Sequence, residues 1–373
     1  MRRRPCVRVG PGLNPILMNA YALNKRAIAW WLVICAAMIF IMVMLGGATR
    51  LTDSGLSMVE WKPLTVLPPM SEAAWAAEFE RYQQFPEFIK ENSWMTVDDF
   101  KGIYALEYTH RLWGRFIGFV FLLPFLYFAA RRAVDRTLGW KLAGLFVLGG
   151  LQGALGWFMV ASGLQDRPDV SQYRLAAHLI TAVILYGAIV WVALDLFDAG
   201  RMRIATHASF VRLVHALPFA VMFVMAAGAF VAGLDAGLIY NTFPLMDGQW
   251  LPPGGMDQAP WYRNLFENVA TVQFEHRVVA IALVLFVGFI WFQGRSAALT
   301  ARARKLLHAT AGMALIQASL GISTLLLVVP VPLALAHQTG ALILFTLSVC
   351  LAHEVRSEQR ALAADFLAAR AAE

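Results

Sequence analysis

The chain has 373 residues, of which 59% are hydrophobic and only 15% are charged. Soluble domains are about 45–50% apolar and about 25% charged, so this composition excludes an ordinary soluble domain and predicts an integral membrane protein. The net charge of +7 does not point to nucleic acid, because basic residues that flank cytoplasmic helix ends give the same excess. We expect membrane lipid around the chain and no nucleic-acid partner.

Eight apolar runs approach or exceed the length of about 20 residues that a helix needs to cross the hydrocarbon core. In chain order they are residues 27–48, 111–130, 142–163, 175–195, 211–234, 274–292, 306–329 and 333–353. The sequence therefore predicts an all-α integral membrane protein with eight transmembrane helices.

Lysine and arginine are concentrated in alternate connections, which sets the expected orientation. Most of them lie in the tail 1–26, in 131–141, around the linker 196–210, in 293–305 and in the tail 354–373. By the positive-inside rule these segments are cytoplasmic, and the long loops 49–110 and 235–273 face outward. Both termini are then cytoplasmic. The N-terminus is a weak targeting signal, so we expect a bacterial inner membrane, with a mitochondrial inner membrane as the alternative.

The chain repeats itself. Four pairs of segments correspond: GGATRLTDSGLS (46–57) with AGAFVAGLDAGLIYNTFPLM (227–246), EYTHR (107–111) with QFEHR (273–277), QGALGWFMVASGL (152–164) with QASLGISTLLLVV (317–329), and YRLAAHLITAVILYG (173–187) with PLALAHQTGALILF (332–345). Four spans is an even number, so both halves, 27–195 and 211–353, have the same orientation. We expect two tandem four-helix bundles related by a pseudo-two-fold axis along the membrane normal.

The eight histidines fall into two groups. His207, His215, His308 and His353 lie at predicted cytoplasmic helix ends, where we interpret them as interfacial polar residues. His110, His178, His276 and His337 each lie in the first turns of a helix that runs from outside to inside, two in each half. These four are expected at one depth near the outer face. Polar groups inside a membrane are costly and tend to mark function.

Paired neutral imidazoles in a helical bundle suit haem iron, for which histidine is a standard axial ligand. One haem is expected between the helices of His110 and His178, and a second between those of His276 and His337. A zinc site would need all four to converge. A di-iron site uses two Glu-x-x-His motifs with further glutamates, but only Glu107-x-x-His110 fits, because Gln273 stands at the matching position.

The absence of CxxCH from the sequence argues against covalent c-type haem. Three arginines at helix entrances, Arg111, Arg115 and Arg277, are candidate partners for haem propionates; the alternative is that they extend to lipid headgroups. Glycines such as Gly153 and Gly156 either let helices pack closely or make room for a macrocycle.

The halves differ at one position that bears on chemistry. Glu107 shares a helix face with His110, whereas its counterpart Gln273 is neutral, and Glu275 points about 100° away from His276. This asymmetry predicts one reactive site and one electron-carrying site. A carboxylate beside an apolar haem pocket can move protons or stabilise a cation during oxidation; the alternative is a Glu107 solvated at the outer surface.

From about residue 25 to 355 the chain resembles the haem A synthase family. The resemblance is carried by GGATRLTDSGLSMVEWKP, FKGIYALEYTHRLWGR, AGLDAGLIYNTFPLMDGQW, QFEHR and AHQTGALILF. The external loop, with WKPLTVLPP and EFERYQQFPEF, is more similar to the proteobacterial and mitochondrial branch. Other branches have a cysteine pair in this loop, which is missing from this chain.

The resemblance implies oxidation of the C8 methyl of haem O to the formyl group of haem A, which haem-copper terminal oxidases use. It implies that His110 and His178 bind the substrate haem, that Glu107 assists catalysis there, and that His276 and His337 ligate a haem b that relays electrons. Haem O synthase and oxidase-assembly factors are expected partners, together with an electron donor or acceptor that the sequence does not name; a homo-oligomer is compatible with it.

Two other functions fit a membrane protein with four such histidines. A bis-haem b electron carrier is one, although carriers that move electrons across the bilayer place their haems at two depths. A haem transporter or chaperone is the other, and it would tolerate loss of the carboxylate at Glu107.

Overall fold

The structure is a computed structural model that describes residues 15–60, 67–163, 170–198 and 206–372, with the backbone alone for 15–23, 162–163 and 356–372. Eight of its helices are long and apolar enough to cross a membrane, judged by length and composition. They are α1 (Pro15–Leu51), α3 (Val97–Ala130), α4 (Arg136–Gly163), α5 (Gln172–Phe197), α6 (Ala208–Gly233), α8 (Val269–Gly294), α9 (Ala301–Leu326) and α10 (Val331–Ala372). The predicted all-α, eight-span class is confirmed.

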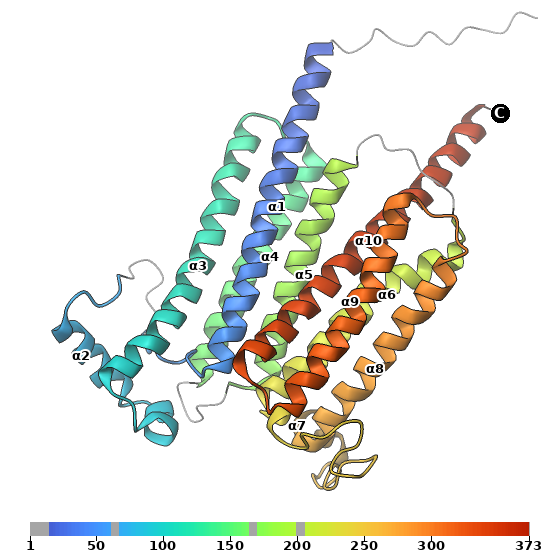
Figure 1. Ribbon diagram of the computed structural model, residues 1–373. Coiled ribbons are helices and arrows are strands. Elements are labelled where there is room, and N and C mark those ends of the chain that lie inside the picture. Colours follow the sequence, from blue (N-terminus) through green and yellow to red (C-terminus); the bar gives the residue numbers. More distant parts are fainter. Residues whose placement is uncertain (1–14, 61–66, 164–169, 199–205, 373) are drawn as a thin grey trace, which may run out of the picture.

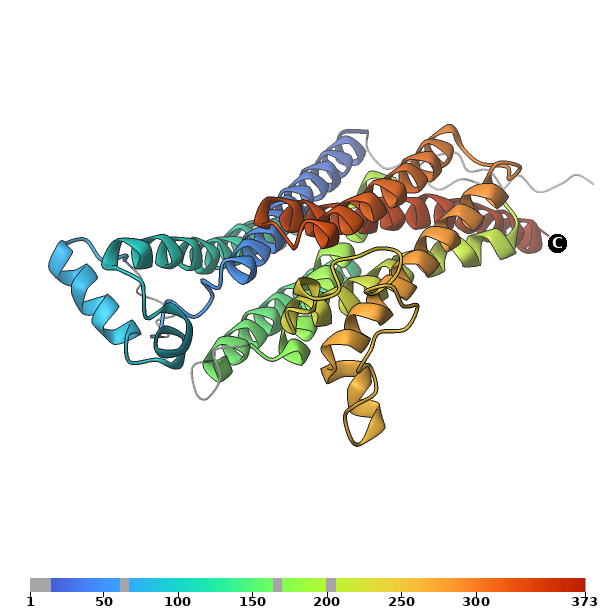
Figure 2. The same cartoon turned by 60° about the horizontal axis from the view of Figure 1, so that its bottom comes forward.

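The long helices form one bundle with two different ends (Figure 1). The short helices α2 (Glu72–Tyr82) and α7 (Asn264–Glu267) lie at one end, which we call the loop end. The start of α1 and the end of α10 lie at the opposite, terminal end. Figure 2 shows α2 and the start of α3 projecting at one edge of the bundle, apart from α7.

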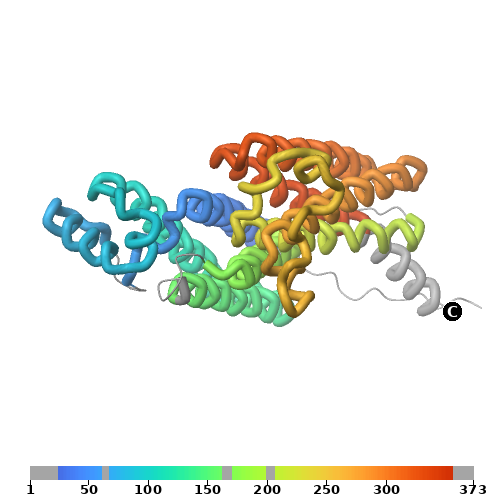
Figure 3. Tube along the Cα trace, turned by 90° about the horizontal axis from the view of Figure 1, so that it is seen from below, coloured from blue at the N-terminus to red at the C-terminus, as the bar shows by residue number. Residues whose placement is uncertain are grey.

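The two halves of the chain pack their helices in the same way. In the first half, α1 contacts α3 and α5, and α4 contacts α3 and α5; in the second half, α6 contacts α8 and α10, and α9 contacts α8 and α10. The halves meet where α5 contacts α6 and α10, and where α1 contacts α10. Seen from below, the first half (blue to green) and the second half (yellow to red) lie side by side (Figure 3).

The core between these helices is apolar and contains fully buried leucines and isoleucines, among them Leu32, Ile189, Leu217 and Leu342. In lipid such contacts gain little from the hydrophobic effect, because lipid tails are as apolar as leucine. The halves are therefore held by close packing and by hydrogen bonds that cross between them. Two examples are Gln338 Nε2, which donates to the Val43 carbonyl at 2.7 Å, and the Tyr186–Thr346 hydroxyl pair at 2.8 Å.

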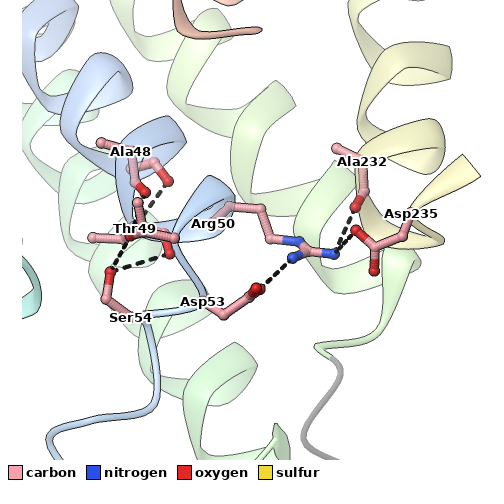
Figure 4. Close-up of polar contacts among 9 residues, drawn as sticks. Ala48, Thr49, Arg50, Asp53, Ser54, Ala232 and Asp235 are labelled. Atoms are coloured by element: carbon pink, nitrogen blue, oxygen red, sulfur yellow. Dashed lines mark hydrogen bonds and ion pairs between the residues drawn. The ribbon is translucent and has the colours of Figure 1, made fainter. Parts of the chain in front are cut away.

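Arg50 joins the halves at the loop end. Its guanidinium donates to Asp53 Oδ1, Asp235 Oδ1 and the Ala232 carbonyl, each at 2.8 Å (Figure 4). Asp53 and Asp235 occupy matching positions after α1 and α6, and both have left-handed backbones, with φ of 47° and 51°, a region that aspartate tolerates better than most residues. One arginine of the first half thus binds the same turn in both halves.

The predicted start of the second span at residue 111 is wrong, because α3 begins at Val97. Thr96 caps the helix in a reciprocal pair with Asp99. The added turns pack Phe100 and Tyr104 onto α2, so the helix continues beyond the apolar run. A count of apolar residues finds only the part of a helix that would lie in hydrocarbon. The residues from 97 to 110, which we expected as part of the long loop 49–110, are helical.

Other predicted boundaries shift by smaller amounts. The tail 354–373 continues α10 as helix to Ala372. The linker 196–210 shortens to the stretch between Phe197 and Ala208, of which 199–205 lie outside the described residues. Residues 1–14 of the N-terminal tail and residues 61–66 of the long loop 49–110 also lie outside them.

The segment between α1 and α3 folds with the start of α3 around a small, mostly aromatic cluster, which we call the cap: Met58, Phe79, Tyr82, Phe100 and Tyr104. Glu87 lies beside it, only 4% exposed, and its Oε2 has no hydrogen-bond partner among the described residues. Burial raises the pKa of Glu87 to about 8, and the negative charges of Glu107, Glu91 and Asp53 add to the rise, although a hydrogen bond with Tyr82 opposes it.

The stability of the cap is therefore expected to depend on pH through Glu87. A carboxyl whose pKa is higher in the folded than in the unfolded state stabilises the fold most below its unfolded pKa. Its contribution is lost as the pH rises from about 4.5 to about 8. Glu87→Gln should flatten this decline, as measured by protease cleavage within 67–96 at pH 6 and pH 9. Equal pH dependence in wild type and variant would contradict the assignment; the exposed Glu80→Gln is the control.

Candidate functional site

Four histidines on four helices form the centre of the candidate site, and each faces a glycine of a neighbouring helix. In the first half, a Cβ added at Gly46 of α1 would lie 3.2 Å from Nε2 of His110 on α3. A Cβ at Gly156 of α4 would lie 2.9 Å from Cε1 of His178 on α5. Either contact is tighter than most real Cβ contacts, so a Cβ at Gly46 or Gly156 would require the ring or the helix to shift.

The second half repeats this arrangement. A Cβ added at Gly228 of α6 would lie 3.1 Å from Cε1 of His276 on α8, and one at Gly321 of α9 would lie 2.7 Å from Cε1 of His337 on α10. Gly46 and Gly228 hold the same place in the repeat, as do Gly156 and Gly321. The packing of histidine on glycine is thus a property of the repeat.

His178, His276 and His337 lie in the second turn of their helices, close to the expected first turns. His110 lies in about the fourth turn, because α3 starts earlier than its apolar run. His110 and His178 are within electrostatic range of each other, and so are His276 and His337. The structure therefore brings together the two pairs that the sequence predicts.

This donor set fits haem better than a bare metal ion. Across the described residues, no group of three or more histidine, cysteine, aspartate or glutamate side chains gathers as a metal site. Two imidazoles with room made for their rings are the set that an axially ligated haem requires. Of the glycines predicted to make room in α4, Gly156 meets a histidine, whereas a Cβ at Gly150 or Gly153 would meet nothing within 4 Å.

Glu107 is not solvated at the surface, because it is only 2% exposed. Its Oε2 accepts hydrogen bonds from the Ser57 hydroxyl at 2.6 Å and from the Met58 N–H at 2.7 Å, and its Oε1 pairs with Arg111. The guanidinium of Arg111 also donates to the Met58 carbonyl at 3.0 Å. We call this set the Glu107 latch, because it fastens the segment after α1 onto α3.

A matching latch exists in the second half with a neutral residue. Gln273 donates to the Ala236 carbonyl at 2.6 Å and accepts from Arg277 at 2.8 Å. Arg277 in turn donates to the carbonyls of Tyr240 at 2.6 Å and Thr242 at 2.8 Å. Two of the three candidate partners for haem propionates, Arg111 and Arg277, thus bind loop carbonyls. A contact of Arg111, Arg115 or Arg277 with haem stays a prediction.

The two latches differ in polarity. Glu107 accepts from an N–H and a hydroxyl of its loop, whereas Gln273 donates to loop carbonyls. The first half therefore keeps a buried carboxylate on the histidine helix, and the second half keeps none at the matching position. The contrast between Glu107 and Gln273 is thus matched by the loops: the first loop presents a backbone N–H to its latch, and the second presents carbonyls.

Sequence reasoning missed several residues of this site. Ser57, Gly46 and Gly321 were not singled out, nor were Gln152 and Gln317, which contact His178 and His337. The available signal was the repeat itself, since QGALG and QASLG share the spacing Gln-x-x-x-Gly.

The other four histidines bond elsewhere. His215 Nδ1 lies 2.8 Å from the Val211 carbonyl, and His308 accepts from Trp291 at 2.9 Å; His207 pairs with Ser209 at 3.0 Å. His353 is not an interfacial residue as expected, because it is 3% exposed and lies 3.0 Å from Asp195. It links α10 to α5 at the terminal end.

The chain is similar to known proteins over most of its length. The family model described as COX15-CtaA, cytochrome oxidase assembly protein, matches residues 29–349. A protein of Nitrosospira multiformis named "Heme A synthase" is 50% identical over 90% of this chain and 95% of its own. One of Parvibaculum lavamentivorans with the same name is 48% identical over 89% and 95%. "Heme A synthase COX15" of Arabidopsis thaliana is 45% identical over 89% and 75%.

The Glu107 latch makes a prediction about stability. Glu107→Ala removes the carboxylate that pairs with the partly buried Arg111 and should cost about 3 kcal/mol. Glu107→Gln keeps one accepting oxygen and should cost about 1–2 kcal/mol. The two variants are compared with wild type by thermal unfolding in detergent. If Gln and Ala lower the melting temperature equally, the charge and not the number of hydrogen bonds holds the latch.

Proposed function

We propose that this chain, which belongs to the COX15-CtaA family of cytochrome oxidase assembly proteins, is a haem A synthase, a membrane oxidoreductase that converts haem O to haem A. The observation that carries the proposal is the pair of imidazoles in each half, every ring set against a glycine at a repeated position. The finer reaction is oxidation of the C8 methyl of haem O to a formyl group.

The two halves have different roles in this proposal. His110 and His178 bind the substrate haem in the half 27–195, and His276 and His337 hold haem b in the half 211–353. Haem b supplies an iron that changes valence and so carries electrons. The buried carboxylate of Glu107, which the second half lacks, supports placing the oxidation in the first half.

Glu107 then has two tasks. It fastens the loop through Ser57 and Met58, and it can take up a proton near the substrate haem. The ion pair with Arg111 fixes this carboxyl in place. Arg111 and Arg277 would pair with haem propionates through their positive charge.

The packing supports the pseudo-two-fold relation between the halves. The helix contacts within one half become those of the other when equivalent helices are exchanged. The equivalent pairs are α1 and α6, α3 and α8, α4 and α9, and α5 and α10. The contacts between halves also map onto each other, since α1 with α10 becomes α6 with α5. An axis along the membrane normal accounts for this exchange.

We further propose that the terminal end of the bundle is cytoplasmic. The basic residues of 131–141 and 293–305 lie in connections at that end. The haem sites are then nearer the outer face of a bacterial inner membrane. Haem O synthase and oxidase-assembly factors are the expected partners, with a separate electron donor or acceptor.

The first test identifies the haems. The protein is purified from cells that also make haem O, and its haems are extracted and identified by chromatography and mass. We expect haem b together with haem O, haem A or a hydroxylated form. Haem b alone at two per chain, unchanged when haem O is present, would instead support an electron carrier.

The second test separates the two tasks of Glu107. Glu107→Gln should lower the yield of haem A at least about a hundredfold, the lower end of typical proton-transfer contributions, and leave haem b bound. The haem b spectrum is the control for folding. Full haem A yield in this variant would exclude the proposed proton transfer and leave only the latch.

The third test uses the glycines. Gly321→Ala places a Cβ 2.7 Å from His337, and Gly156→Ala places one 2.9 Å from His178. Gly321→Ala should reduce haem b content, and Gly156→Ala should reduce substrate haem while leaving haem b. Gly153→Ala, whose Cβ would meet nothing within 4 Å, is the control. Loss of the same haem from both variants would contradict the assignment of the halves.

A further inference from the structure

Two glutamines at matching positions of the repeat hold one histidine of each pair. Gln152 Nε2 on α4 donates to the backbone carbonyl of His178 at 2.9 Å and lies 3.1 Å from its Nδ1. Gln317 Nε2 on α9 donates to the carbonyl of His337 at 2.9 Å and lies 3.1 Å from its Nδ1. The same two distances recur at matching positions of the two halves, which indicates a requirement shared by both sites; Gln152 Nε2 also lies 3.4 Å from Nε2 of His178.

The glutamine and the glycine of each Gln-x-x-x-Gly segment act on the same ring. Residues four apart lie on one face of a helix, so Gln152 and Gly156 both face His178, and Gln317 and Gly321 both face His337. The glycine leaves space on the side of Cε1, and the amide meets the ring at Nδ1. One helix thereby sets the ring position of the histidine on the next.

Each glutamine also has an unused acceptor. Oε1 of Gln152 and Oε1 of Gln317 are buried and have no hydrogen-bond partner among the described residues. A buried acceptor left unpaired lowers the stability of the fold. Such an atom next to a candidate ligand indicates that a donor is expected there in another state of the protein.

Ligand chemistry identifies that donor. A neutral histidine that binds a metal through Nε2 carries its proton on Nδ1, and this N–H almost always donates to an outer partner. Rotation about the last side-chain bond of the glutamine exchanges its two amide atoms, so that Oε1 faces Nδ1–H while Nε2 gives up its hydrogen bond to the histidine carbonyl. For His110 and His276, by contrast, the described residues provide no side-chain hydrogen bond to the ring, so these partners belong to one ligand of each pair.

We propose that Gln152 and Gln317 are positioning residues that orient His178 and His337 as haem ligands, with their amide oxygens accepting from Nδ1–H when haem is bound. This inference rests on the proposed function, because it requires those histidines to be ligands. It adds that each haem has one imidazole held by a glutamine of the neighbouring helix and one that is not.

The test uses the full-length protein and measures haem retention and ligand geometry, not turnover. Outer partners of a metal ligand typically contribute 10–100-fold to affinity. Gln317→Leu should therefore release haem b to excess apomyoglobin about tenfold faster or more, and should change the electron paramagnetic resonance spectrum of the low-spin ferric haem. Gln317→Glu, which keeps an accepting oxygen, should retain haem b and lower its reduction potential, because a carboxylate makes the imidazole a stronger donor.

Gln152→Leu is the matched control, since it should leave the haem b spectrum and release rate unchanged. Wild-type release and spectrum in Gln317→Leu, with haem b lost from His337→Ala, would overturn the positioning role and leave the proposed function intact. Retention of haem b in both Gln317→Leu and His337→Ala would overturn the ligand assignment itself. If Gln317→Leu folds poorly, the reduction potential of haem b in Gln317→Glu decides between the outcomes. A reduction potential unchanged from wild type would overturn the proposal.

Discussion

An imidazole needs space between two transmembrane helices, and in this protein that space is provided by glycine. Each of the four central rings lies where a neighbouring helix has no Cβ. The rings therefore stay inside the bundle while their helices remain in contact with the helices on either side. The pairing of histidines, the fit to haem and the likeness of the two halves all depend on these four contacts.

The bundle must also satisfy polar groups without water. Backbone carbonyls and N–H groups at the loop end would be costly to leave unpaired at a membrane boundary. The latches at Glu107 and Gln273 pair these groups with side chains from the histidine helices, and Arg50 pairs the ends of α1 and α6 with each other. The helices α3 and α8, which carry His110 and His276, thus also fix the loops in place.

Duplication makes two equal sites, whereas the proposed function gives them different roles. The difference is concentrated at the latch, where one half retains a carboxylate and the other an amide. Glu107 and Gln273 each hold the loop of their own half. Gln273, which bonds both Arg277 and the loop, shows that a neutral side chain can hold the loop.

Much of this organisation is visible in the sequence, because the bilayer imposes length and polarity on every span. Eight apolar runs, the repeat, the four central histidines and the contrast between Glu107 and Gln273 all follow from residue type and spacing. Tertiary structure alone decided where α3 begins, since Phe100 and Tyr104 extend it by packing on α2 rather than on lipid. It also decided that Arg111 binds loop carbonyls, that Arg50 joins the halves and that Gln152 and Gln317 meet histidines on other helices. Those contacts join residues far apart in the chain, and no local pattern specifies which helix faces which.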